Sequence, residues 1–140
     1  MGSLRDDCVF CKIIAGTSPA WVVYEDEHSI AFLDSKPIAP GHILVCPKMH
    51  AERLTQLQGE MNELNATLRR IAHLVEERLS VDYNIGANQG PKAGQVVFHH
   101  HWHVIPRRQG DGSDWERKRL TPEAAEETFR LLGIKPLRRP

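Results

Sequence analysis

The chain has 140 residues, a length that suits one domain with a hydrophobic core of its own. Its 18 basic residues (Lys and Arg) are balanced by 18 acidic residues (Asp and Glu), so the overall charge argues against a nucleic-acid or a membrane partner. No stretch approaches the roughly 20 consecutive apolar residues that a membrane-spanning helix needs.

The N-terminal segment carries two acidic residues and a pair of closely spaced cysteines. Asp6 and Asp7 precede only a short apolar run, which does not resemble a signal peptide, so we expect a cytoplasmic protein. In that compartment the odd number of cysteines, 3, argues against a disulfide framework. The spacing Cys8-x-x-Cys11 is typical of zinc ligands or of a redox pair, and metal is favoured because nothing strand-like precedes Cys8. The remaining interpretation is two semi-buried thiols that bind no metal. Residues 12–16 predict a short helical turn that ends at a glycine.

Three short strands are predicted in the next part of the chain. Residues 21–25 and 30–34 are rich in apolar and β-branched side chains and are separated by a charged turn, a pattern typical of a hairpin. Residues 42–46 predict a third strand that ends at Pro47.

A long helix is predicted from the spacing of apolar residues. They recur at positions 54, 57, 61, 64, 68, 71 and 75, in steps of three and four, and Gly59 indicates that the helix proper begins just after it. The simplest interpretation is a helix that lies on the sheet, and the regular seam also allows contact with a partner subunit. Residues 81–87 predict a fourth strand, and residues 88–94 form a loop rich in turn formers.

The stretch from 94 to 107 carries three alternate histidines. Its apolar residues and its end at Pro106 predict a fifth strand. Alternate side chains of a strand share a face, so we expect His99, His101 and His103 to point the same way, with neighbours roughly 6.6–7 Å apart. His100 would lie on the opposite face, which is mostly core. Such a row of imidazoles predicts a chemical site, either for a metal or for nucleophilic and acid–base chemistry, and spacing alone does not choose between them.

The C-terminal part is predicted to contain a polar loop, a helix and an irregular tail. Residues 109–119 are expected to form a mobile loop; Thr121 caps a helix with Pro122 at its first position and Gly133 after its end. The basic residues near this end predict a solvated face, with help for an anionic ligand as the second interpretation. Together these elements predict an α+β fold with about five antiparallel strands, one long helix and one or two short ones.

The motifs together resemble those of the histidine triad (HIT) family, in its zinc-containing branch. The resemblance covers about residues 7–108 of a single domain 1–140, with a C-terminal loop, short helix and tail at 109–140. The matching motifs are Cys8-x-x-Cys11-Lys-Ile-Ile, Ala31-Phe32-Leu33-Asp34, Pro40-Gly41-His42, Pro47-Lys48-Met49-His50, Asn88, Gly94-Gln95, His99-x-His101-x-His103 and Pro106-Arg107.

The resemblance implies an enzyme that cleaves purine nucleotides at the α-phosphorus, either an AMP phosphoramidate or a dinucleoside polyphosphate. His101 would attack the phosphorus and form a nucleotidyl-imidazole, which water releases as a nucleoside monophosphate. The backbone near His99 would fix the His101 tautomer, and His103 and His42 would hold the phosphate and the leaving group. The nucleotide-binding positions would be Asp34 for the ribose hydroxyls, Asn88, Gln95 and Val96 for hydrogen bonds, and Phe32, Ile14 and Ile43 as walls for the base.

By the same resemblance, a structural zinc would be held by two thiolates and two imidazoles, and the protein would be a homodimer. The ligands would be Cys8, Cys11, His50 and His99, a closed tetrahedral set. His101 and His103 would then remain available for chemistry. Val96 departs from the family, since many relatives have Ser or Thr there, and we expect one contact to the transition state to be weaker. The alternatives are a non-catalytic purine-nucleotide-binding zinc scaffold and a hydrolase that binds zinc on the triad itself.

Overall fold

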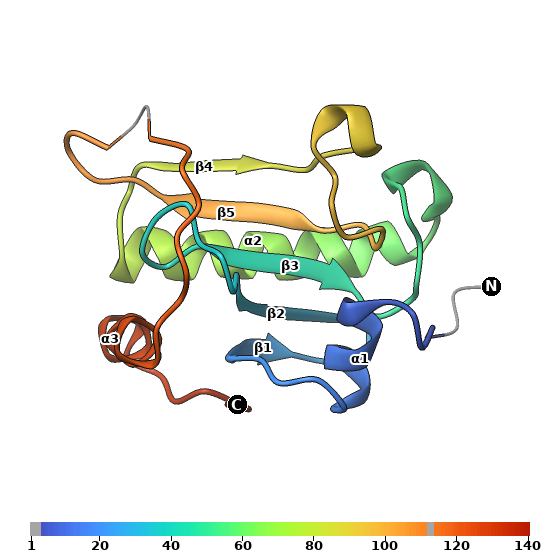
Figure 1. Cartoon of the computed structure of the whole chain (residues 1–140), viewed down its shortest axis with the longest axis horizontal. Helices are drawn as coiled ribbons and strands as arrows, with labels where there is room; N and C mark the ends of the chain where they lie inside the picture. The colour runs from blue at the N-terminus through green and yellow to red at the C-terminus, as the bar shows by residue number, and fades with distance from the viewer. Residues whose placement is uncertain (1–3, 112–113) are drawn as a thin grey trace.

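A five-stranded antiparallel sheet forms the centre of the protein (Figure 1). The computed structural model describes residues 4–111 and 114–140. The sheet order is β1-β2-β3-β5-β4, and every neighbouring pair is antiparallel. This arrangement confirms the α+β class and the predicted sheet. The strands are β1 (Val22–Glu25), β2 (Ser29–Leu33), β3 (Ile43–Pro47), β4 (Tyr83–Gly86) and β5 (Trp102–Pro106).

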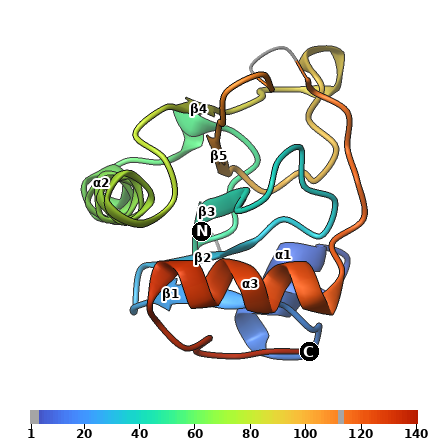
Figure 2. The same cartoon turned by 90° about the vertical axis from the view of Figure 1, so that its left-hand side faces the viewer.

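Helices lie on both faces of this sheet, with α2 and α1 on opposite sides (Figure 2). Among the described residues, no helix is long and apolar enough to cross a membrane. The helical segments are α1 (Val9–Ala15), η1 (Leu54–Gln56), α2 (Glu60–Arg78), η2 (Pro91–Ala93) and α3 (Pro122–Leu132).

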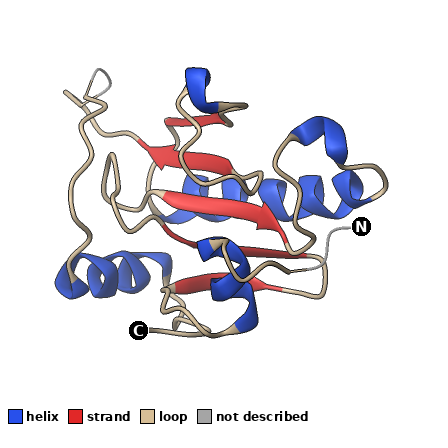
Figure 3. Ribbon diagram, turned by 45° about the vertical axis from the view of Figure 1, so that its right-hand side comes forward, coloured by secondary structure: helices blue, strands red, loops and turns tan. Residues whose placement is uncertain are grey.

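Figure 3 shows the helices in blue. Two of them, α1 and α3, end at glycines that the sequence predicts as caps. Gly16 ends α1 in the left-handed region, with φ of 83°, a conformation that costs glycine little because it has no Cβ. The Thr121 hydroxyl accepts a hydrogen bond from the Ala124 N–H at 3.1 Å, and Gly133 ends α3. The long helix begins at Glu60, directly after Gly59, as the sequence predicts.

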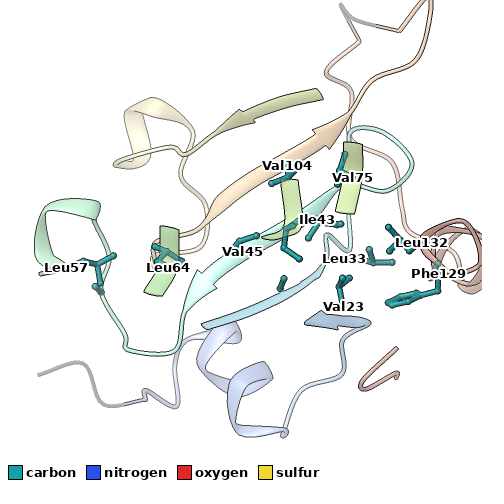
Figure 4. Packing of buried hydrophobic residues seen from close by; sticks show 14 residues of the cluster. Val23, Leu33, Ile43, Val45, Leu57, Leu64, Val75, Val104, Phe129 and Leu132 are labelled. Carbon is teal, nitrogen blue, oxygen red and sulfur yellow. The ribbon is translucent and has the colours of Figure 1, made fainter. Parts of the chain in front are cut away.

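The main core lies between α2 and one face of the sheet (Figure 4). Leu64, Ile71 and Val75, which belong to the predicted seam, are at most 1% exposed. They pack against alternate residues of the central strands, and α3 closes the end of this core with Phe129 and Leu132. The strand residues of this cluster are Val23, Ala31, Leu33, Ile43, Val45 and Val104.

A second cluster lies on the opposite face, where α1 packs. Along β2 and β3 the side chains that point to this face are the ones between the core residues, as the period of two in a strand requires. Phe10, Cys11 and Ile13 of α1 cover them. The strand residues are Val22, Ile30, Phe32, Leu44 and Cys46. This face also carries the histidines.

The fifth strand is shorter than predicted. It begins at Trp102, whose pairing with Val45 is the first of the ladder between β3 and β5, so His99 and His101 precede the regular strand. The segment before it follows a separate path, because the His100 N–H donates to the carbonyl of Ala51 at 2.6 Å. His100 is fully buried, and its Nδ1 accepts a hydrogen bond from the Gln89 amide at 3.2 Å.

The described loop and tail of the C-terminal segment are irregular, as predicted, but hydrogen bonds hold them against the sheet and its loops. Residues 112–113 of the predicted loop lie outside the described residues. After them, the N–H of Lys118 donates to the Pro37 carbonyl at 2.9 Å, and that of Leu120 donates to Ser35 at 3.0 Å. The tail pairs with β1 through an isolated bridge between Val22 and Arg138. The C-terminal segment therefore takes part in forming the α1 face.

Candidate active site and metal centre

A cavity of about 720 Å³ opens on the α1 face of the sheet. Its polar lining includes Asp34 at the end of β2, His101 and His103 around the start of β5, and the cationic Lys36 and Arg117. Its apolar lining comes from α1, the central strands and the loop before the histidines. These apolar residues include Phe10, Ile13, Phe32, Leu44, Val96 and Val97.

The backbone determines which nitrogen of His101 carries a hydrogen. Nδ1 of His101 lies 2.7 Å from the carbonyl oxygen of His99. A carbonyl can only accept a hydrogen bond, so Nδ1 carries the hydrogen and Nε2 keeps its lone pair. Burial lowers the pKa of His101, which favours this neutral form. The Phe10 ring packs edge-on against the imidazole, with centroids 5.0 Å apart. This side chain can therefore act as a nucleophile without first losing a proton.

His42 fixes the tautomer of His103 in the same way. The Ile38 N–H donates to Nδ1 of His42 at 3.0 Å, so the hydrogen of neutral His42 is on Nε2. That nitrogen lies 2.9 Å from Nδ1 of His103, which must accept, and the hydrogen of His103 is therefore on its own Nε2. Burial lowers the pKa of His42 to about 3 and that of His103 to about 4, so both rings are neutral near pH 7. His42 does not line the cavity itself and acts on it through His103.

Asp34 is held by two donors from different parts of the chain. Its Oδ1 accepts a hydrogen bond from the Lys36 N–H at 2.9 Å, and its Oδ2 accepts one from Arg117 Nη1 at 2.8 Å. Oδ2 also lies 3.4 Å from Nε2 of His42. No motif in the sequence points to Arg117 as the partner of Asp34. Its only signal is its place in the basic cluster Arg117-Lys118-Arg119 near the C-terminal end.

Asp34, His42 and His103 place one ligand atom each within 4.8 Å of one another. The hydrogen bond between the two rings accounts for this closeness, because it uses Nε2 of His42 and Nδ1 of His103. His101 is not a member of this group. A metal ion that used these same two nitrogens would have to break that bond.

Two of the three predicted base-wall residues differ by one position from those that line the cavity. Phe32 lines it, but Ile43 is fully buried in the main core on the α2 side, and its neighbour Leu44 faces the cavity. In α1, Ile13 takes the place predicted for Ile14. A shift of one residue moves a strand side chain to the opposite face of the sheet, so the motif alone did not identify the right one.

The amides of Asn88 and Gln95, which are predicted to bind the nucleotide, bond to backbone groups in this structure. Gln95 is buried; its Oε1 accepts from the Gly90 N–H at 2.7 Å, and its Nε2 donates to the Glu52 carbonyl at 2.9 Å. Asn88 donates to the Gly94 carbonyl at 3.4 Å. Neither side chain lines the cavity, so both amides stabilise the loop instead. Val96 does line the cavity, and its side chain is exposed.

A cluster of two cysteines and two histidines shares His99 with the triad. One ligand atom from each of Cys8, Cys11, His50 and His99 lies within 4.8 Å of the others, and all four residues are buried. Cys11 Sγ is 3.2 Å from His50 Nδ1, and Cys8 Sγ is 3.5 Å from His99 Nδ1.

The tautomer of His99 suits a metal ligand. Its Nε2 lies 2.7 Å from the Pro47 carbonyl and so carries the hydrogen, which leaves the lone pair of Nδ1 directed at the thiols. Burial raises the pKa of Cys11 to about 11, so a cation is needed to make this thiol a thiolate. Two sulfur and two nitrogen donors fit a tetrahedral zinc ion.

Comparison with known proteins agrees with this architecture. The family model described as HIT domain matches residues 15–110. A HIT-like protein of Methanocaldococcus jannaschii is 50% identical over 108 residues, which cover 75% of this chain and 82% of that protein. An adenylylsulfatase of Arabidopsis thaliana is 38% identical over 111 residues, 78% of this chain and 56% of that protein. The crystal structure of a Zn-bound histidine triad family protein from Mycobacterium smegmatis has a TM-score of 0.78 at 38% identity, covering 91% of this chain and 94% of that one.

The five-stranded antiparallel sheet, the three alternate histidines and the adjoining Cys and His cluster are the features of a histidine triad protein of the zinc-containing kind. This chain belongs to the HIT domain family.

The neutral histidines predict a loss of stability in mild acid. His42 and His103 bind protons at a pKa near 6.5 when unfolded and at about 3 and about 4 when folded. The unfolded state therefore binds more protons as the pH falls from 6.5 towards 4, and each histidine lowers the free energy of unfolding by on the order of 1 kcal/mol per pH unit in this window.

Urea denaturation at a series of pH values should show this dependence of the free energy of unfolding on pH. We expect His42→Asn to make the slope shallower than in the wild type. Equal slopes in the two proteins would contradict the assignment.

Proposed function

We propose that this protein is a nucleotide hydrolase or transferase that acts at the α-phosphorus of a purine nucleotide through a nucleotidyl-His101 intermediate. The observation that carries the proposal is the hydrogen bond from Nδ1 of His101 to the His99 carbonyl, which leaves the Nε2 lone pair of a neutral imidazole at the cavity wall. The Arabidopsis relative, named an adenylylsulfatase, supports the same class of reaction.

In the proposed first step, Nε2 of His101 attacks the α-phosphorus. A phosphorus–nitrogen bond forms, and the bond from phosphorus to the leaving group breaks, with its electron pair departing on the leaving group. The Nε2–H of His103 is the donor available to the developing negative charge, and His42 holds it in this tautomer. In the second step water attacks the phosphorus, the bond from phosphorus to Nε2 breaks with its electron pair returning to Nε2, and the proton that water loses passes to solvent. The products are a nucleoside monophosphate and the neutral imidazole.

The cavity walls support a nucleoside as the recognised group. Phe32, Ile13 and Leu44 offer apolar surface for a flat base, and Asp34 offers carboxylate oxygens for ribose hydroxyls. The proposed substrates are an AMP phosphoramidate or a dinucleoside polyphosphate. Because Val96 has no hydroxyl, only its backbone N–H can assist there. We also propose that residues 1–140 act as a single domain, since α3 shares the main core with the sheet.

Replacement of His101 by Ala should abolish turnover. We expect the release of AMP from adenosine 5′-phosphoramidate or diadenosine polyphosphate to fall by about 10³-fold or more, because the attacking nitrogen is lost. Intact-mass spectrometry during turnover should detect a nucleotidyl adduct on the wild type and none on the variant. His73→Ala, at an exposed histidine on α2, is the matched control and should behave as wild type. Turnover that persists in His101→Ala would exclude this nucleophile. Nucleotide binding without any turnover by the wild type would favour the scaffold alternative.

We propose that the Cys and His cluster binds a structural zinc ion. The ion would be held by Cys8, Cys11, His50 and His99, and its chemistry would be to supply positive charge that keeps the buried thiolates ionised. With all four protein donors in place, no position is left open for a substrate. The ion would join α1 to the backbone of His99.

Metal analysis of purified variants can separate this structural zinc from a zinc ion on the triad. Cys8→Ser should lose zinc by elemental analysis and should unfold at a lower temperature, because one of four ligands is missing. Cys46→Ala is the matched cysteine control, since Cys46 is buried outside the cluster, and it should keep one zinc per chain. His101→Ala should keep zinc as well. Loss of zinc from His101→Ala would support a zinc ion bound by the triad histidines and overturn this assignment.

We further propose that the protein forms a homodimer through the β4 side of the sheet. Support comes from Val81 and Ile85, which are 75% and 47% exposed on and beside this edge strand. Light scattering at micromolar protein should give twice the mass of one chain. Ile85→Lys should shift the mass towards one chain, because a charge cannot be buried there cheaply. Leu137→Lys, an exposed apolar position elsewhere, is the control. A wild-type mass of one chain would exclude the dimer.

A further inference from the structure

The C-terminal segment places a second charged residue at the carboxylate of Asp34. Two backbone hydrogen bonds, from Lys118 to Pro37 and from Leu120 to Ser35, align this segment with the loop after β2. Arg117 lies just before them, and its Nη1 donates both to Asp34 Oδ2 at 2.8 Å and to the Lys36 carbonyl at 2.7 Å. The backbone pairing therefore fixes the position of this guanidinium beside the cavity.

Arg117 changes the sign of the charge at this end of the cavity. Among the side chains of the described residues that line it, Asp34 has the only carboxylate, whereas Lys36 and Arg117 are both cationic. These three side chains together carry one excess positive charge. All the hydrogen bonds that Arg117 makes within the described residues use Nη1, so its Nε and Nη2 hydrogens remain available, and the side chain is 42% exposed.

The cavity is large for a small-molecule site. Its volume of about 720 Å³ lies in the upper part of the range of about 300–1,000 Å³ that is typical of small-molecule sites. Beyond the histidines and Asp34, the lining continues over Trp21, Lys36, Arg117, Leu120 and Pro140. In the proposed pose, with the phosphate at the histidines and the ribose at Asp34, the ribose lies next to the Arg117 guanidinium, because this group bonds to the same carboxylate.

We propose that Arg117 makes the cavity selective for nucleotides that carry a second phosphate on the ribose, at the 2′ or the 3′ oxygen. The inference rests on the proposed function, because that function places the ribose at Asp34. Beside a lone carboxylate a ribose phosphate would be repelled. A guanidinium offers several fixed donors to phosphate oxygens, and Lys36 adds a second positive charge. The ribose hydroxyl that is not esterified can still donate to Asp34.

Calorimetric titration with three ligands tests this selectivity. The ligands are AMP, adenosine 2′,5′-bisphosphate and adenosine 3′,5′-bisphosphate, and the proteins are wild type, Arg117→Gln, Arg117→Lys and Lys118→Gln. We expect the wild type to bind one bisphosphate about tenfold more tightly than AMP, the gain typical of one charge-assisted hydrogen-bond pair. Arg117→Gln should lose this ratio, and Arg117→Lys should keep part of it. Lys118→Gln removes a neighbouring charge that does not line the cavity and should keep the ratio.

The outcomes separate this inference from the proposed function. If the wild type binds AMP but neither bisphosphate more tightly, or if Arg117→Gln keeps the preference, the role of Arg117 is wrong and the proposed function stands. If the wild type binds none of the three ligands, the proposed function fails and the inference fails with it. Thermal unfolding of each variant shows whether a lost ratio comes from a misfolded protein.

Discussion

The carbonyl oxygen of His99 is the group on which the geometry of the site depends. A carbonyl accepts hydrogen bonds and cannot donate one, so its contact with Nδ1 of His101 permits only one tautomer of that ring. The ring of His99 is held at both nitrogens, by the Pro47 carbonyl on β3 and by the thiols that α1 supplies. The sheet, the first helix and the cavity therefore meet at one residue, and a displacement of any of them would move the backbone that orients His101.

Backbone groups, rather than charged side chains, organise the histidines. The Ile38 N–H and the His99 carbonyl each bond to one ring nitrogen, and the bond between His42 and His103 transmits the first of these constraints across β3 and β5. Burial disfavours the protonated form of each ring, so the network holds neutral imidazoles with defined donors and acceptors. Such a network needs little rearrangement when charge develops on a bound group, because its dipoles are already fixed.

Local sequence signals predicted the elements well, and they failed where long-range packing decides the outcome. Gly16, Thr121 and Gly133 mark helix ends through backbone chemistry that acts within a few residues, and the seam of α2 reflects one continuous buried face. The family motif named Ile43, but a strand alternates its faces, and only the tertiary structure shows that Leu44 points into the cavity. The side-chain amide of Gln95 bonds to the backbone of Gly90 and Glu52. The pairing of Arg117 with Asp34 joins residues 83 positions apart and leaves no local pattern in the sequence.

The contact between the C-terminal tail and β1 has a consequence for how the sheet can grow. A sheet has two edges, and each exposes backbone groups that can pair with another chain. Here the tail occupies the outer side of β1 at Val22, where its own N–H and carbonyl groups bond to Leu137 and Arg138. Among the described residues, no such bridge lies on the outer side of β4. Pairing through a single edge joins two sheets and then stops, so a tail that blocks the other edge at Val22 works against open-ended fibre formation.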